Sequence, residues 1–250
     1  MAVFQAALIN ELEKLRKKKK VMVAVILSLL VIVVGQLLVL GVRLGFGIRG
    51  AGSADFSMLV LSVAVNTLLP LFAALVAIDS FSGEFAQNTM RITLTRPVSR
   101  FKLFSAKVSA IGIFILANLG LLLLFSLLAG FVFDGGTMSF KGIWQSTLSY
   151  TVSFIPLFVL ALGIVFLANV LKSGISVFFV SILAFILFKG LGMLFSQYSG
   201  ILLTSYFDWY NLWLANSFPL MKIIRQFLLM LGYALLFFTG AYYLFDKKEF

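Results

Sequence analysis

The chain has 250 residues, 62% of them hydrophobic, and a mean hydropathy of +1.10. Soluble domains are about 45–50% apolar, so an ordinary water-soluble fold is excluded, and we predict one all-α integral membrane domain over residues 1–250. The net charge of +11 does not indicate nucleic-acid binding, because most basic residues flank apolar stretches, where membrane orientation and anionic lipid account for them. Without cysteine or histidine, the chain has no disulfides, no thiolate metal site and no histidine or cysteine catalysis.

Residues 1–20 form a predicted amphipathic helix at the membrane surface. Phe4, Leu8, Leu12 and Leu15 recur at helical spacing and make one apolar stripe. The basic run at 16–20 suits anionic head groups on the cytoplasmic side. A simple basic anchor for the first membrane span is the alternative interpretation.

Six apolar stretches follow, each long enough to cross a bilayer, which takes about 20 residues. The expected spans are residues 21–42, 56–78, 108–133, a stretch within 142–171, 175–195 and 226–245. Most basic residues fall in the N-terminal segment, in the loop after span two and at the C-terminus. Short cytoplasmic loops carry an excess of Lys and Arg, so both termini are predicted to be cytoplasmic and the chain to be a multi-pass plasma-membrane protein.

Residues 196–225, between spans five and six, are the least regular part. Trp209, Tyr210 and Trp213 lie there, and such side chains favour the membrane–water interface. We predict a short extracellular segment, helical or re-entrant.

The longest polar stretch, residues 79–107, separates spans two and three. Gly83 interrupts the chain after the membrane exit, and residues 84–94 can form a helix that ends before Pro97. Ser99 is a suitable N-cap for the next helix. Composition alone favours a simple positively charged inside loop.

The order of residues in this stretch resembles the cytoplasmic loop of type 2 ABC transporter permeases. The resemblance rests on Gly83-Glu84, Asn88-Thr89, Arg96-Pro97-Val98-Ser99-Arg100 and Lys107, with Asn88-Thr89-Met90 where the family usually has Gly-Thr-Leu. It implies that residues 79–107 hold a coupling helix, which docks on a separate ATP-hydrolysing subunit. The implied coupling residues are Asp79, Glu84, Phe85, Met90, Arg91, Arg96 and Arg100. The resemblance also implies that two permease subunits meet through spans one and five.

Catalytic motifs are absent from the sequence. No G-x-x-x-x-G-K-[ST] phosphate loop occurs, so the chain is expected not to be an enzyme and to bind no cofactor, while a partner ATPase binds ATP and Mg. Asp79 and Glu84 are expected at the surface and make no convincing acid–base pair. No acidic residue falls within an expected span, which argues against proton-coupled transport.

A weak polar track runs through the spans. It comprises Gln36, Ser62, Asn66, Thr67, Asn118, Ser149, Ser153 and Asn169. These side chains either form interhelical hydrogen bonds, worth about 0.6 kcal/mol each, or line a path for an amphipathic substrate. The path would include Ser62, Asn66, Thr67, Asn118 and Lys189. Lys189, within span five, either extends to the interface or faces an internal path or a partner subunit.

These observations predict the permease subunit of an ATP-driven bacterial exporter. Its expected partners are the lipid bilayer, a second copy or a homologous permease subunit, and two separate ABC ATPase subunits. The expected substrate is amphipathic or lipophilic. The alternative is a non-catalytic membrane scaffold or accessory subunit without a translocation path, and copurification of an ATPase distinguishes the two.

Overall fold

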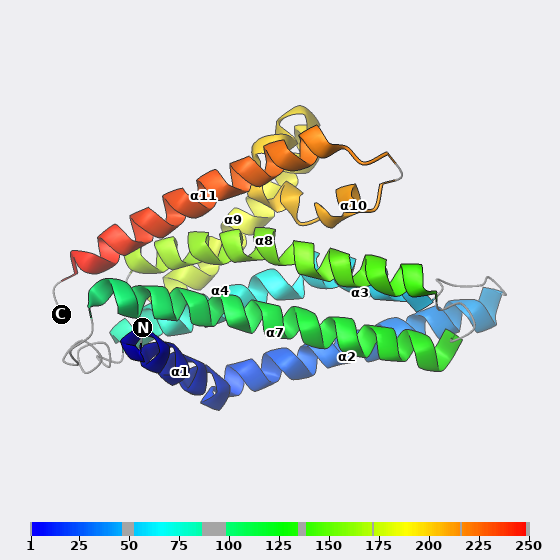
Figure 1. Cartoon of the computed structure of the whole chain (residues 1–250), viewed down its shortest axis with the longest axis horizontal. Coiled ribbons are helices and arrows are strands. Elements are labelled where there is room, and N and C mark those ends of the chain that lie inside the picture. Colours follow the sequence, from blue (N-terminus) through cyan, green and yellow to red (C-terminus); the bar gives the residue numbers. More distant parts are fainter. Residues whose placement is uncertain are drawn as a thin grey trace.

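The computed structural model describes residues 2–46, 53–86, 99–134, 139–171, 173–215 and 217–248, and this part of the chain is a helical bundle without strands. The long helices run along one axis (Figure 1). Helix α1 begins and α11 ends at the same end of the bundle, called here the terminal end.

The helices of the described residues follow the expected order. They are α1 (Ala2–Lys17), α2 (Lys19–Phe46), α3 (Ser53–Asn66), α4 (Leu68–Ser80), α5 (Ser82–Ala86), α7 (Arg100–Asp134), α8 (Phe140–Val170), α9 (Gly174–Leu194), α10 (Tyr210–Trp213) and α11 (Leu220–Asp246), with two 3-10 turns, η2 (Ser196–Ile201) and η3 (Leu203–Tyr206). Six apolar helices are long enough to cross a membrane. The all-α class and the expected number of six spans are therefore confirmed.

Span two, expected over residues 56–78, is divided at Thr67 into α3 and α4. Pro70 lacks the N–H that would bond to the carbonyl of Asn66 in an unbroken helix. The side chains of Asn66 and Thr67 bond back to the carbonyls of Ser62 and Val63, at 3.0 and 2.5 Å, which also favours a bend. The expected stretch 56–78 is therefore helical on both sides of Thr67, and its membrane-length helix begins at Leu68.

The irregular segment before the last span is shorter than expected. Helix α11 begins at Leu220, directly after Pro219, and already includes Lys222 and Arg225. The expected start at 226 is wrong, because no Gly or Pro interrupts residues 220–231 and the helix can extend back to Pro219. Before it, η2, η3 and α10 fold back, so that α10 lies between α11 and α8 (Figure 1).

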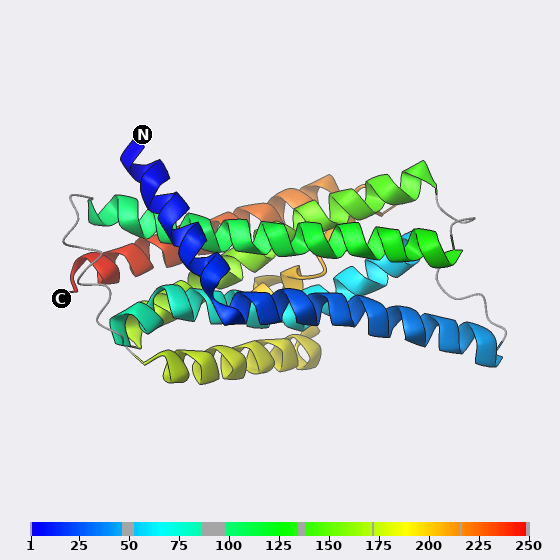
Figure 2. The same ribbon diagram turned by 90° about the horizontal axis from the view of Figure 1, so that it is seen from below.

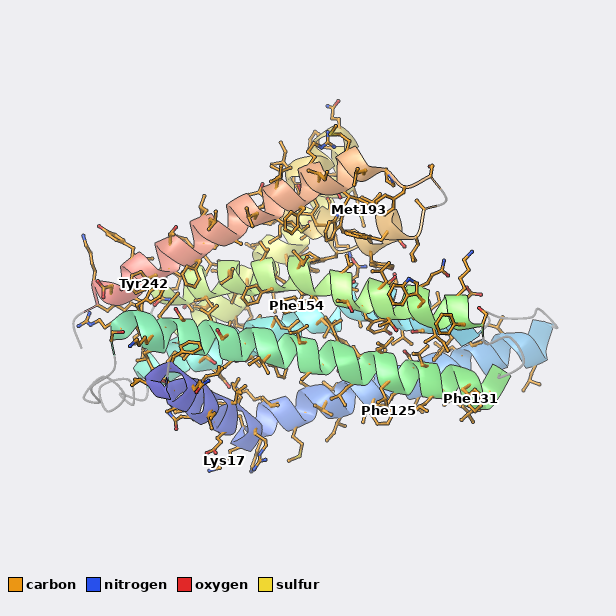
Figure 3. All side chains as sticks on the ribbon, viewed as in Figure 1. Lys17, Phe125, Phe131, Phe154, Met193 and Tyr242 are labelled. Atoms are coloured by element: carbon orange, nitrogen blue, oxygen red, sulfur yellow. The ribbon has the colours of Figure 1, made fainter. Side chains whose placement is uncertain are left out.

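The core is formed mainly by α3, α4, α7 and α8, while α2, α9 and α11 keep largely exposed apolar faces. Helix α1 crosses α7 obliquely at the terminal end (Figure 2). Tyr242 of α11 also lies toward this end, whereas Phe131, near the end of α7, lies at the opposite one (Figure 3). The terminal end therefore gathers α1, the end of α4, α5, the start of α7 and the end of α11.

Candidate functional sites

Four charged side chains from three helices meet at the terminal end. Lys107 of α7 donates to Glu11 of α1 (Nζ to Oε2, 2.9 Å) and to Glu84 of α5 (Nζ to Oε2, 2.8 Å). Lys14 of α1 donates to the other oxygens of the same carboxylates, at 2.7 Å to Glu11 and 3.2 Å to Glu84. These four residues are called the charge cluster. They join segments that lie far apart in the sequence.

The apolar stripe of α1 brings the charge cluster together. Leu8, Leu12 and Leu15 pack against the core, and Leu15 is only 5% exposed. Glu11 and Lys14 are three residues apart, hence neighbours on the helix surface beside this stripe. When the stripe packs inward, both side chains are carried toward α7. The stripe therefore contacts protein.

Burial makes the charge cluster sensitive to the loss of any member. Lys107 is fully buried, while Glu11 and Glu84 are 3% and 8% exposed. Burial raises the pKa of Glu11, but Lys107 and Lys14 together lower it more, so it lies below the ordinary value of 4.5. Burial lowers the pKa of Lys14, but Glu11 and Glu84 raise it more, so it lies above 10.5. The charge cluster thus places two carboxylates opposite two ammonium groups.

Asp79 ties the turn between α1 and α2 to the end of α4. Its carboxylate pairs with Lys20 at 2.8 Å, and its backbone carbonyl accepts from Lys18 at 3.2 Å. Burial lowers the pKa of Lys18, and Asp79 opposes that shift. Two of the five residues in the basic run at 16–20 therefore contact protein.

Helix α5 and the start of α7 are held by α8 and by the end of α11. Ser82 donates to the Ala168 carbonyl of α8 at 3.1 Å. The guanidinium of Arg100 donates to the backbone carbonyls of Asp246 and Lys248. The ammonium of Lys248 lies 3.8 Å from the centroid of the Phe85 ring and also reaches Asn169.

The expected coupling residues therefore divide into two groups. Asp79, Glu84, Phe85 and Arg100 are described, and each contacts its own chain. The expectation that Glu84 lies at the surface is wrong, because pairing with Lys107 draws its carboxylate inward. Met90, Arg91 and Arg96, with most of the expected 84–94 helix, fall outside the described residues. The sequence analysis missed Glu11 and Lys14, whose signal is their spacing beside the apolar stripe of α1.

A second polar site lies at the break in span two. Lys189 of α9 donates to Asn66 (Nζ to Oδ1, 2.7 Å), and the amide nitrogen of Asn66 donates to Asp208 at 3.0 Å. These three residues are called the polar break. Lys189 therefore contacts α3 of its own chain through Asn66. A role in a substrate path stays a prediction.

An apolar cleft of about 190 Å³ lies beside the polar break. Its lining combines α4, α8 and α9 with Thr67, and consists of Thr67, Pro70, Leu71, Ala74, Leu160, Ile164, Ser181, Ile182 and Phe185. The buried Ser181 hydroxyl has no hydrogen-bond partner among the described residues. Phe185 also lies near the ammonium of Lys189, 5.9 Å from ring centroid to Nζ. The cleft therefore adjoins a cation at one edge.

The other members of the polar track do not form one continuous line. Asn118 accepts from Ser28 of α2 at 2.9 Å, and Ser62 bonds to Tyr210. Ser149 and Ser153 bond to carbonyls of their own helix. Ser62 and Asn118 thus bond to other segments, Ser149 and Ser153 bond within α8, and Thr67 lines the cleft. The expected place of Ser62 and Asn118 in a substrate path stays a prediction.

Comparison with known families gives one match. The family described as ABC-2 family transporter protein matches residues 7–187, which is most of the chain. No curated protein matches the chain. The matched region contains the whole charge cluster and Asn66, and it ends two residues before Lys189.

Proposed function

Because the chain belongs to the ABC-2 transporter family, we propose that it is the permease subunit of an ATP-driven exporter for an amphipathic or lipophilic substrate. Membership of the family and six helices able to span a membrane make it a multi-pass membrane transport component. The match over residues 7–187 is the observation that carries the proposal. Export, substrate and subunit number belong to the proposal.

In this proposal, residues 79–107 dock on a separate ATPase, which binds the ATP and Mg. The charge cluster supports this role, because it connects α5, near the start of the stretch, to Lys107 of α7 at its end and to α1. A displacement of the stretch would reach these three helices together. Arg91 and Arg96 are the proposed contacts with acidic groups on the ATPase. Glu84 would act by holding the base of the stretch.

A second permease subunit would complete the transporter. The apolar faces of α2 and α9 are largely exposed along their lengths, as span one and span five pairing requires. Figure 2 shows α9 at the margin of the bundle. Apolar exposure also suits lipid, so the pairing needs its own test.

Purification from native membranes tests the proposal. A tagged chain should retain an ATPase subunit that carries a phosphate loop, and the reconstituted complex should export substrate only with ATP and Mg. Reporter fusions at residues 5 and 90 should report the cytoplasm, and fusions at 50 and 137 the outside. If the chain purifies intact without any ATPase, the scaffold alternative replaces the permease.

A further inference from the structure

We propose that the cleft between α4, α8 and α9 binds the tail of a single-chain anionic amphipath, whose head group pairs with Lys189. The inference rests on the proposed function, because it assigns the substrate class and its place in the permease. The occupant is a long-chain carboxylate, sulfonate or phosphate monoester.

The cleft fits one hydrocarbon chain. Seven of its nine lining residues are apolar, with Pro70, Leu71 and Ala74 on α4 facing Ile164 of α8 and Ile182 of α9. Its volume of about 190 Å³ lies below the roughly 300–1,000 Å³ of sites that enclose a whole drug-sized ligand. The cleft therefore has room for part of one narrow tail, and a two-chain lipid would leave its second chain outside.

The Ser181 hydroxyl is a second sign of an occupant. It is buried in the cleft wall, and none of the described residues provides it with a hydrogen-bond partner. Buried polar groups are nearly always paired. An oxygen atom of the anionic head group is the part of such an occupant that can bond to this hydroxyl.

Lys189 provides the charge for the head group. Its half-buried ammonium lies beside Phe185, which also lines the cleft. Asn66 takes one of its three donor hydrogens, so two can bond to an anion. Phosphate and carboxylate oxygens accept such charge-assisted bonds well.

Asp208 does not cancel this preference. Its carboxylate is exposed and bonds to the far side of the Asn66 amide. The Asn66 amide therefore lies between the ammonium of Lys189 and the carboxylate of Asp208. Among the described residues, the cleft lining itself carries no charge. A cationic head group at the same place would meet Lys189 as a like charge.

Binding of spin-labelled chain probes tests the proposal. The full complex is placed in phosphatidylcholine nanodiscs at pH 8 and titrated with nitroxide-labelled stearate and with a nitroxide-labelled trimethylammonium amphipath of equal chain length. The immobilised component of the spectrum measures binding. We expect the carboxylate to bind at least about tenfold more tightly than the ammonium probe, because a hydrogen bond to a charged group contributes at least this factor.

Three variants locate the site. Lys189→Met should weaken stearate binding about tenfold and remove the preference over the ammonium probe. Ser181→Phe fills the cleft and should weaken both probes. Lys222→Met removes an exposed lysine of α11 and should change neither.

The outcomes separate this inference from the proposed function. Unchanged stearate affinity in a well-assembled Lys189→Met complex overturns the inference, as does equal or tighter binding of the ammonium probe. Competition by two-chain phosphatidylglycerol as effective as that by unlabelled stearate also overturns it. ATPase association is measured on the same samples. A chain that binds stearate but retains no ATPase refutes the proposed function alone, and a complex that retains its ATPase but shows no preference refutes only the inference.

Discussion

Replacing Lys107 by methionine should release α1 from the bundle. Methionine keeps most of the length of the side chain but removes the ammonium that joins Glu11 to Glu84. Lys14 alone would then face two carboxylates, both almost fully buried. Breaking a buried ion pair by removing one partner costs about 3–5 kcal/mol, because the remaining charge is left uncompensated.

The contact between α1 and α7 is weakened by part of this free-energy cost. Glu11 lies on α1 and Glu84 on α5, so we assign half of the cost, about 2 kcal/mol, to the contact between α1 and α7. A change of this size raises the fraction of chains with α1 detached about thirtyfold. The chain has no native cysteine, so a single Leu15→Cys reports detachment: Leu15 is 5% exposed when α1 is packed. Its rate of maleimide labelling should rise by that factor.

Two controls make the test specific. Lys102→Met removes an exposed lysine of the same helix and should leave labelling unchanged. Adding Glu11→Gln and Glu84→Gln to Lys107→Met removes the uncompensated charges and should restore slow labelling in part. Equal labelling rates in Lys107→Met and the parent would refute the argument that the charge cluster holds α1 in place.

Three further predictions follow from the same contacts. Glu11 has a lowered pKa, so its contribution to the packing of α1 is present above pH 4.5 and is lost as the pH falls through its folded pKa. Lys14 has a raised pKa, so its contribution is present below pH 10.5 and is lost as the pH rises through its folded pKa. The distance between spin labels on exposed Ile9 and Leu116 should therefore stay constant between those limits and lengthen beyond them; constancy in strong acid contradicts this. Arg91→Glu should leave membrane insertion intact and lower ATPase copurification and transport. Glu84→Lys should first lower the stability of the chain, because Lys14 and Lys107 would face a third positive charge. Normal transport by Arg91→Glu would leave residues 79–107 as a simple positively charged loop. Single cysteines on α2 and α9 should crosslink two copies in membranes, and crosslinking restricted to α7 or α8 would reject that pairing.

The sequence predicted the spans well because an apolar run of sufficient length has few alternatives in a membrane. The division at Thr67 was not predicted, since it depends on how Asn66 and Thr67 bond to nearby carbonyls as well as on Pro70. Burial of Glu84 was missed for another reason. Glu84 pairs with Lys14 and Lys107, and the packing of α1 on α7 brings these two lysines together.

The charge cluster and the polar break differ in their position relative to the region that matches the family. The matched region, residues 7–187, contains Glu11, Lys14, Glu84 and Lys107, so the whole charge cluster lies in the part shared with ABC-2 transporters. Lys189 and Asp208 lie beyond it, although their common partner Asn66 lies within. The proposed coupling role therefore concerns residues inside the matched region. The charge at the edge of the cleft must be tested on this chain, because the matched part of α9 ends before the lysine that determines it.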